Sequence, residues 1–329
     1  MLGLIERVRS LLHSEPALVP LTILAVSVAA FGVVLGSRFL SPFTLSLILQ
    51  QVMIVGLVGA AQTLVVLTAG IDLSGGAIMV LTSVVMGHCA VHYGWPTPLA
   101  ILAGFALGAA LGCVNGWLVA RMKLQPFIVT LATWQIVLAT NFLYSGNESI
   151  RSQVIEAQAP LLQLFGRPLE VAGASLTLGA GALVGLVALL SYVLRHTAWG
   201  RHVYAIGDDA DAAELAGVQV RRTLISVYVL AGVICALAGW VLIGRVGSVA
   251  PTSGQFANIE SITAVVIGGV SLFGGRGSIF GMLFGSLIVG VFGLGLRIAG
   301  ADPQWTYLLI GVLILAAVSI DRWIRGLAA

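Results

Sequence analysis

Asp72 and Ser74 stand in the stretch TAGIDLSGG, which separates two long apolar runs at residues 68–76. An ionisable group between runs of this length is costly unless protein or water surrounds it. Non-helical backbone at membrane depth is tolerated only where it is buried in protein or lines a water-filled cavity. The two side chains are therefore candidates for a polar translocation pathway. The alternative is that Asp72 or Ser74 caps the next helix, because both residue types are favoured helix caps.

Four further polar side chains in apolar surroundings are pathway candidates: Asn115, Thr130, Thr133 and Glu260. Asn115 lies inside an apolar run, where an amide either joins two helices or lines a path. Thr130 and Thr133 leave the same choice open, because a threonine hydroxyl can also bond the backbone of its own helix. Glu260 opens a later apolar run after a glycine-containing break, as Asp72 does earlier in the chain.

No pattern typical of an enzyme is present. The five histidines lack HExxH spacing, and no serine lies in a GxSxG turn. The glycine-rich stretch 264–281 lacks the lysine of a phosphate-binding loop, since the only lysine of the chain is Lys123. His88 and His92 are four residues apart on one helix face, but no third metal ligand is evident. We expect no catalytic residue, no ATP hydrolysis and no metal in this chain.

The composition shows which solvent surrounds the elements that position these side chains. Hydrophobic residues make up 59% of the 329 residues, charged residues only 9%, and the mean hydropathy is +1.05. Such values lie outside the range of soluble domains and predict a protein embedded in a lipid bilayer. The net charge of +3 is spread over many short connections, which excludes nucleic acid as a partner.

Ten apolar runs of membrane-spanning length follow one another along the chain. They begin near Leu18, Leu45, Ala77, Pro98, Phe127, Ser175, Thr223, Ile262, Ile279 and Gln304. Basic residues concentrate on the cytoplasmic side of membrane proteins, and a cytoplasmic N-terminus places most of the 16 basic residues there. These residues are Arg7, Arg9, Arg121, Lys123, Arg195, Arg201, Arg221, Arg222, Arg276, Arg322 and Arg325. We expect both termini in the cytoplasm.

The ten runs predict an all-α integral membrane protein with a single permease domain over residues 1–329. An even split gives five helices in each half, so the second half enters the membrane from the opposite side, as in inverted repeats. The first half covers residues 1–173 and ends in a long external loop at 145–173. The second half covers residues 174–329 and contains a polar cytoplasmic connection at 199–222.

This connection, from Trp199 to Arg222, is rich in both acids and bases. Helix-forming residues stand between two glycines, and a short helix capped by Asp208 or Asp209 and ended at Gly217 is expected. Such a helix parallel to the membrane would serve as a lever. An ordinary solvated loop is the alternative.

Four stretches in order carry a family resemblance. They are GIDLS at 70–74, NG at 115–116 with PFIVTL at 126–131, GRHVYAIG at 200–207 with AA at 212–213 and AGV at 216–218, and GGVSLFGGRGS at 268–278. Between residues 44 and 321 the chain resembles the ribose-type sugar permeases of ATP-binding-cassette importers, in the branched-chain amino acid/ribose permease superfamily. Gly75 replaces the usual valine, and Asn258 stands where relatives often carry Glu.

The resemblance implies a type II importer-like permease in the inner (cytoplasmic) membrane, which moves a monosaccharide such as ribose or fructose by alternating access. It implies a second copy of the permease, a cytoplasmic ATPase that binds ATP and Mg, and an external sugar-binding protein. This chain itself would hold no cofactor. The residues implied to couple it to the ATPase are Gly207, Asp208, Ala212, Ala213, Glu214 and Gly217.

Other transport functions remain alternatives. A permease of the same family could carry a branched-chain amino acid, a nucleoside or a signalling sugar. A secondary transporter driven by H+ or Na+ would need its own ion site, for which Asp72 and Glu260 are the only acids near the membrane core. A passive channel is the remaining alternative.

Overall fold

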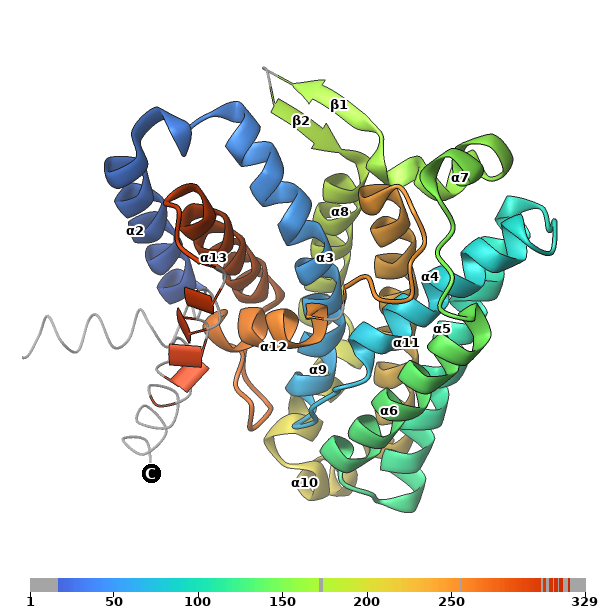
Figure 1. The fold of residues 1–329 in the computed structure, drawn as a ribbon. Coiled ribbons are helices and arrows are strands. Elements are labelled where there is room, and N and C mark those ends of the chain that lie inside the picture. Colours follow the sequence, from blue (N-terminus) through green and yellow to red (C-terminus); the bar gives the residue numbers. More distant parts are fainter. Residues whose placement is uncertain are drawn as a thin grey trace, which may run out of the picture.

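The computed structural model describes residues 17–302, apart from 172, 173 and 255, and part of the stretch 304–319. Within these residues seven helices are long and apolar enough to cross a membrane. They are α2 (Leu18–Leu35), α3 (Pro42–Leu67), α5 (Thr97–Met122), α6 (Pro126–Ser145), α8 (Leu178–His196), α11 (Val220–Val246) and α13 (Ile279–Ile298). Two shorter apolar helices, α4 (Gly75–Val91) and α12 (Ala257–Ile267), lie among them (Figure 1).

The predicted spans correspond closely to these helices. Seven of them begin within three residues of a long helix, and the third and eighth coincide with the short helices α4 and α12. The tenth, from Gln304, lies partly outside the described residues, so the count of ten remains a prediction. Caps explain the boundaries: Ser41 accepts a hydrogen bond from the Thr44 N–H at 3.1 Å, and prolines stand in the first turns of α3, α5 and α6.

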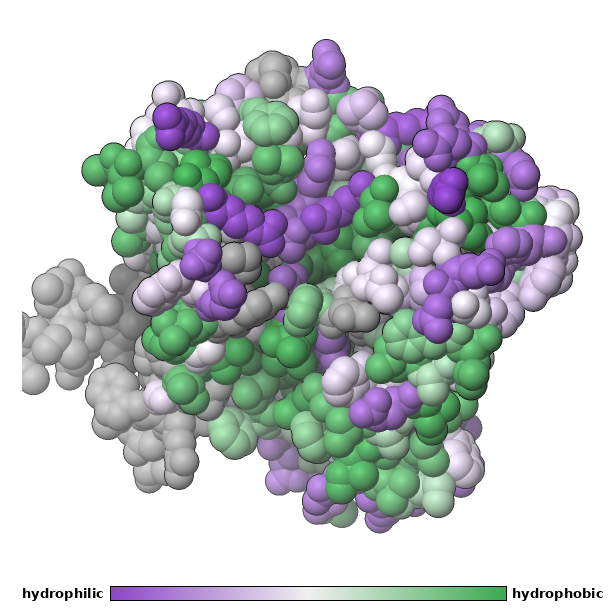
Figure 2. Space-filling model, in the orientation of Figure 1, coloured by the Kyte–Doolittle hydropathy of each residue, from purple (hydrophilic) through white to green (hydrophobic). Residues whose placement is uncertain are grey.

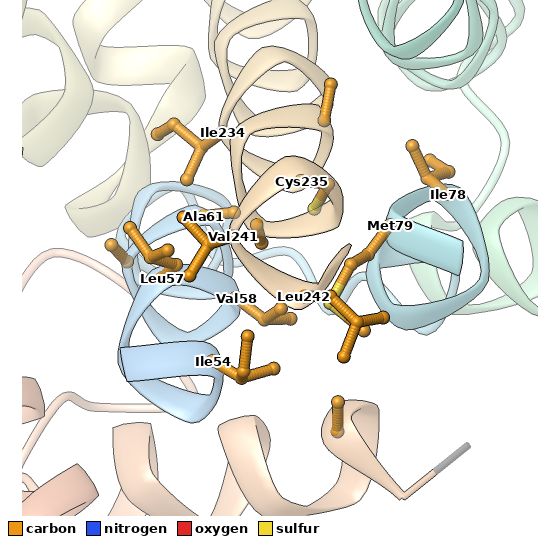
Figure 3. Close-up of a cluster of buried hydrophobic side chains, with 14 of the residues drawn as sticks. Ile54, Leu57, Val58, Ala61, Ile78, Met79, Ile234, Cys235, Val241 and Leu242 are labelled. Atoms are coloured by element: carbon orange, nitrogen blue, oxygen red, sulfur yellow. The ribbon is translucent and has the colours of Figure 1, made fainter. Parts of the chain in front are cut away.

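Helices α3 and α11 form the centre of the bundle. Two-thirds (67%) of the most apolar window of each is buried, against 11% in α2 and 22% in α6. Figure 3 shows Val58 of α3, Met79 of α4 and Leu242 of α11 pointing toward one another in this core. In a membrane such helices associate through close packing, because lipid is as apolar as the side chains.

A glycine seam joins α5 to α11. A methyl group at Gly108 would come 2.5 Å from the carbonyl oxygen of Gly232, and one at Gly112 would come 2.2 Å from that of Tyr228. A methyl group at Gly116, one turn further, would come 2.9 Å from the Cα of Ile225. Residues four apart share one helix face, so the three glycines let the two backbones meet along three turns.

The outer helices carry many exposed apolar side chains. Examples are Val33 on α2, Ile136 and Leu143 on α6, and Val184 on α8, each more than 60% exposed. Figure 2 shows hydrophobic side chains over α2 and over α5 and α6, and hydrophilic ones toward α7 at the top and α10 at the bottom. An apolar belt between two polar ends is the surface of a protein that spans a bilayer.

The long connection after α6 is structured. It contains α7 (Ser152–Gln158), the 3-10 turn η2 (Pro160–Gly166) and an antiparallel hairpin of β1 (Pro168–Val171) and β2 (Ala174–Thr177). An isolated bridge between Ile150 and Val249 ties its start to the segment after α11. The sequence predicted only a polar loop here, because strands of four residues give too little alternation to be recognised.

The remaining short elements lie at helix ends. They are η1 (Gly36–Arg38), α9 (Ala198–Asp208) and α10 (Ala210–Leu215). Helices α9 and α10 lie at the end of the bundle opposite the hairpin (Figure 1).

Candidate functional site

The break between α3 and α4, residues 68–74, is the centre of the candidate site. Ala69 has a φ of 60°, and the N–H of Gly70 returns to the Val65 carbonyl at 3.1 Å, which ends α3. A side chain at Gly70 would approach both Val65 and the hydroxyl of Tyr228. The chain therefore turns sharply inside the bundle, and α4 begins at Gly75, close to the middle of the molecule (Figure 1).

A chain of hydrogen bonds fixes this break to α5 and α6. The Asp72 Oδ1 accepts from the Ser74 N–H at 2.7 Å and from the Ser74 hydroxyl at 2.6 Å. The Asn115 amide donates to the Ser74 Oγ at 2.9 Å, and the Thr133 hydroxyl donates to the Asn115 Oδ1 at 2.6 Å. The Thr130 hydroxyl lies 2.9 Å from the Ile71 carbonyl. We call these side chains, with the two introduced next, the polar network.

Gln62 and Asn258 extend the polar network to α3 and to the second half of the chain. The Gln62 amide donates to the Asp72 carbonyl and, at 3.2 Å, to the Asn258 Oδ1. The Asn258 amide donates to the Leu73 carbonyl, and its oxygen accepts from Gly76 N at 3.5 Å. Asn258 of α12 thereby holds the first residues of α4, so the two short helices meet at this point.

The polar network is closed in this conformation. Asp72 is 5% exposed, and Ser74, Asn115 and Thr130 are fully buried. Their partners are one another and nearby carbonyls, which is the arrangement expected of interhelical hydrogen bonds. Ser74 is the N-cap residue of α4 but forms no side-chain cap, and Asp72 accepts from the N–H of Ser74 itself. A role of these side chains in the translocation pathway remains a proposal.

Gln62 was not predicted as a site residue, and Asn258 was noted only as a departure from the family pattern. Gln62 was visible as the only amide in the second half of α3, beside Thr63. Asn258 is 196 residues away from its partner Gln62 in the sequence, and no local sequence pattern predicts a contact between residues so far apart. Two buried polar atoms of the site lack a partner among the described residues, the Gln62 Oε1 and the Tyr228 hydroxyl.

Glu260 does not join the polar network. The Gln51 amide donates to the Glu260 carboxylate at 3.3 Å, and Arg245 donates to the Gln51 Oε1 at 2.6 Å. Arg297 of α13 adds a second positive charge close to the carboxylate. This polar cluster lies at the end of α11 that faces the hairpin, where hydrophilic residues cross the surface above α12 (Figure 2).

The polar connection at 199–222 folds into two helices. The Asp209 carboxylate accepts from the N–H groups of Asp211 and Ala212, each at 3.0 Å, and caps α10. Gly217 adopts a φ of 89°, in the left-handed region where glycine commonly ends a helix. The predicted short helix with an Asp209 cap and a Gly217 stop is confirmed. Helix α9, capped by Thr197, was not predicted.

The six residues expected to couple to an ATPase divide into two groups. Gly207 and Ala213 are buried, whereas Asp208, Ala212, Glu214 and Gly217 are exposed. Leu215, which the sequence analysis did not single out, is 91% exposed at the end of α10.

Gly207 belongs to a junction of three segments. A methyl group there would lie 1.8 Å from the Leu67 carbonyl oxygen and 2.5 Å from the Gly275 nitrogen. The Gly275 N–H donates to the same Leu67 carbonyl at 3.1 Å. We call Leu67, Gly207 and Gly275 the glycine junction. It joins the end of α9 directly to the last residue of α3, where the break begins.

Tyr204 strengthens this contact between α9 and the loop before α13. Its hydroxyl donates to the Gly277 carbonyl at 3.0 Å. Burial raises the pKa of the Tyr204 phenol, so it stays protonated and remains a donor. A cavity of about 340 Å³ lies beside the junction, lined by the break, the end of α9 and Tyr228.

His88 and His92 lie at the hairpin-facing end of α4. Their rings are 4.6 Å apart, and the Tyr144 ring lies 5.2 Å from His88. Within the described part of the chain, no group of three or more His, Cys, Asp or Glu side chains could hold a metal ion.

The apolar belt, the helix broken at a buried polar network and the exposed helix pair at one end define a multi-pass membrane permease. The chain belongs to the family described as the permease component of branched-chain amino acid transport systems, whose model matches residues 44–318. This confirms the family-level resemblance.

Curated relatives are sugar permeases. The chain is 66% identical over 99% of its length to a fructose import permease of Rhizobium meliloti, covering 91% of that protein. It is 38% identical to a ribose import permease of Bacillus subtilis over 88% of each chain. It is 32% identical to a xylose transport permease of Haemophilus influenzae over 91% of this chain and 94% of the relative. No solved structure gives a significant match.

Proposed function

We propose that this chain is the membrane permease subunit of an ATP-driven importer for a monosaccharide, with fructose as its substrate. The observation that carries the proposal is the 66% identity to the Rhizobium meliloti fructose import permease over nearly the whole chain. Identity to the ribose and xylose permeases is about half as high. The permease works in the inner membrane with both termini in the cytoplasm.

A separate cytoplasmic ATPase drives the cycle by docking on α9 and α10. The exposed Glu214 and Leu215 of α10 give this surface a charged group and an apolar anchor. The ATPase binds ATP and Mg, so this chain needs no cofactor. A sugar-binding protein delivers substrate on the opposite side, where the structured segment from α7 to β2 lies.

The glycine junction transmits movement from the docking helices to the break. A shift of α9 moves Gly207 against the Leu67 carbonyl, because no side chain separates the two backbones. The break and its polar network then rearrange, and the path between the two sides of the membrane opens alternately. Contacts with sugar along the path are few, since tight binding would slow release.

A second copy of the permease covers α6. Gln135 is exposed near the middle of this span, although most of the helix is apolar. A glutamine facing lipid leaves its amide without partners, whereas an interface between two copies supplies them.

Transport by the reconstituted system tests the proposed function. The permease, its ATPase and its sugar-binding protein are placed in proteoliposomes, and uptake of radiolabelled fructose is measured with and without ATP. Fructose uptake should require ATP and should be inhibited by unlabelled fructose more strongly than by ribose, xylose or leucine. Uptake driven by a Na+ or H+ gradient without ATP would refute the importer, and preferred uptake of leucine would refute the sugar assignment.

A further inference from the structure

An open groove lies at the end of the bundle that carries α10, between α5, α10 and the start of α11. Its volume is about 490 Å³. Three arginines line it, Arg121 at the end of α5 and Arg221 and Arg222 in the first turn of α11. Glu214 is the single acid in the lining, so the groove carries an excess of positive charge. The glycine seam holds α5 and α11 together and so fixes the separation of these arginines.

The groove opens onto the apolar surface of the bundle. Trp117 lies one turn before Arg121 on the same face of α5 and is 50% exposed, and Val114, at a similar exposure, lies a further turn away. Ile225, one turn after Arg221, lines the groove on the side of α11. Basic side chains that end an apolar, tryptophan-containing face mark the level of the lipid headgroups.

The backbone of α11 adds to this preference for an anion. Its N-cap residue, Gln219, forms no side-chain cap, and its side-chain Oε1 instead accepts from the Arg222 guanidinium at 2.8 Å. The Val220 N–H donates to the Val218 carbonyl at 2.9 Å, and the groove lies at the N-terminus of this 27-residue helix, the end that favours an anion.

We propose that this groove binds the phosphate group of an anionic phospholipid from the adjacent leaflet, which is the cytoplasmic leaflet in the proposed orientation. Arg121 and Arg221 hold the phosphate from two helices, and the acyl chains lie along Trp117 and Val114. Basic pockets between membrane helices on the cytoplasmic side are suited to such headgroups. A free phosphate would use the arginines but not the apolar face.

Native mass spectrometry of the purified permease tests the site. The chain is equilibrated with phosphatidylglycerol and phosphatidylcholine of identical acyl chains, and the retained lipid is counted. The wild type should retain more phosphatidylglycerol than phosphatidylcholine. The double variant Arg121→Gln/Arg221→Gln should reduce this preference about tenfold, because each arginine near a headgroup contributes to anion binding. Arg201→Gln, an exposed arginine on α9 outside the groove, should behave as the wild type.

Three outcomes would overturn the proposal. The first is a double variant with an unchanged melting temperature and wild-type lipid retention. The second is displacement of phosphatidylglycerol by millimolar inorganic phosphate, which would make the site one for small anions. The third is a double variant that retains lipid but no longer co-purifies with the ATPase, which would make the groove a protein interface. If the double variant does not fold, each single variant should show part of the loss. The detergent sample presents lipid to both ends, so the result is independent of membrane orientation.

Discussion

At the scale of single residues, the candidate site is a set of short polar side chains around one turn of backbone. The sequence predicted five of its members, Asp72, Ser74, Asn115, Thr130 and Thr133, because polar groups in apolar runs are conspicuous. Glu260 was grouped with them but lies with Gln51 and Arg245 instead. The partners in α3 and α12 could not be predicted, since they depend on how distant helices pack.

Replacement of Asp72 separates a structural role from a transport role. Asp72→Asn keeps one carbonyl oxygen to accept from Ser74, so the variant should unfold close to the wild-type temperature while fructose uptake falls. Asp72→Ala leaves the Ser74 donors without a partner and should destabilise the permease by about 1–3 kcal/mol. Thermal unfolding in detergent and uptake in proteoliposomes are measured together.

Asp302→Ala, an exposed acid after α13 and outside the segment from α7 to β2, is the matched control and should change neither quantity. Wild-type uptake by Asp72→Asn would exclude a transport role for the charge. Strong destabilisation by Asp72→Asn would indicate that the carboxylate has a structural role through its bonds to Ser74.

At the scale of elements, the sequence-based prediction and the structure differ in the connection between α8 and α11. Its capping residues predicted α10, because Asp209 and Gly217 are strong local signals. Helix α9 was missed because it contains two glycines, Gly200 and Gly207, which are poor helix formers, and the sequence analysis expected only one short helix, ending at Gly217. The consequence is that α9, rather than α10, makes the direct contact with α3.

Gly207→Ala tests whether this contact transmits movement. The added methyl group meets the Leu67 carbonyl oxygen, so the junction must separate or shift, at a cost of about 1–3 kcal/mol. We expect a variant that still co-purifies with the ATPase but loses most ATP-dependent fructose uptake. ATPase co-purification and uptake are assayed on the same preparation.

Gly185→Ala in α8 is the control, since nothing lies within 4 Å of the added atom. Normal uptake by Gly207→Ala would contradict transmission through the glycine junction. Loss of ATPase binding by the same variant would place Gly207 in the docking surface instead.

At the scale of the whole molecule, span positions followed from hydropathy alone, because the bilayer imposes length and apolarity on every crossing helix. Hydropathy did not predict that α4 and α12 are too short to cross the membrane, since a short helix and a full span give similar apolar runs. The two short helices occupy the third place in each predicted half and meet through Asn258, while the inverted repeat itself stays a prediction.

A photo-crosslink from α6 tests for the second copy. Gln135→Cys, in a chain carrying Cys113→Ser, is labelled with benzophenone maleimide and irradiated in membranes. A dimer band should form, because the exposed Gln135 needs a protein partner in the bilayer. Val184→Cys on the lipid-facing side of α8 is the control and should yield only monomer. Equal yields from both positions would indicate random collision rather than an interface.

The glycine seam has a mechanical consequence. Packed helices slide past one another by small changes of side-chain rotamers at their contact. Where a glycine of one helix rests on a carbonyl oxygen of another, there is no rotamer to change, and sliding would bring backbone atoms into collision. Helices α5 and α11 must therefore travel as one rigid body in any movement of the bundle, and any shear has to occur at their neighbours.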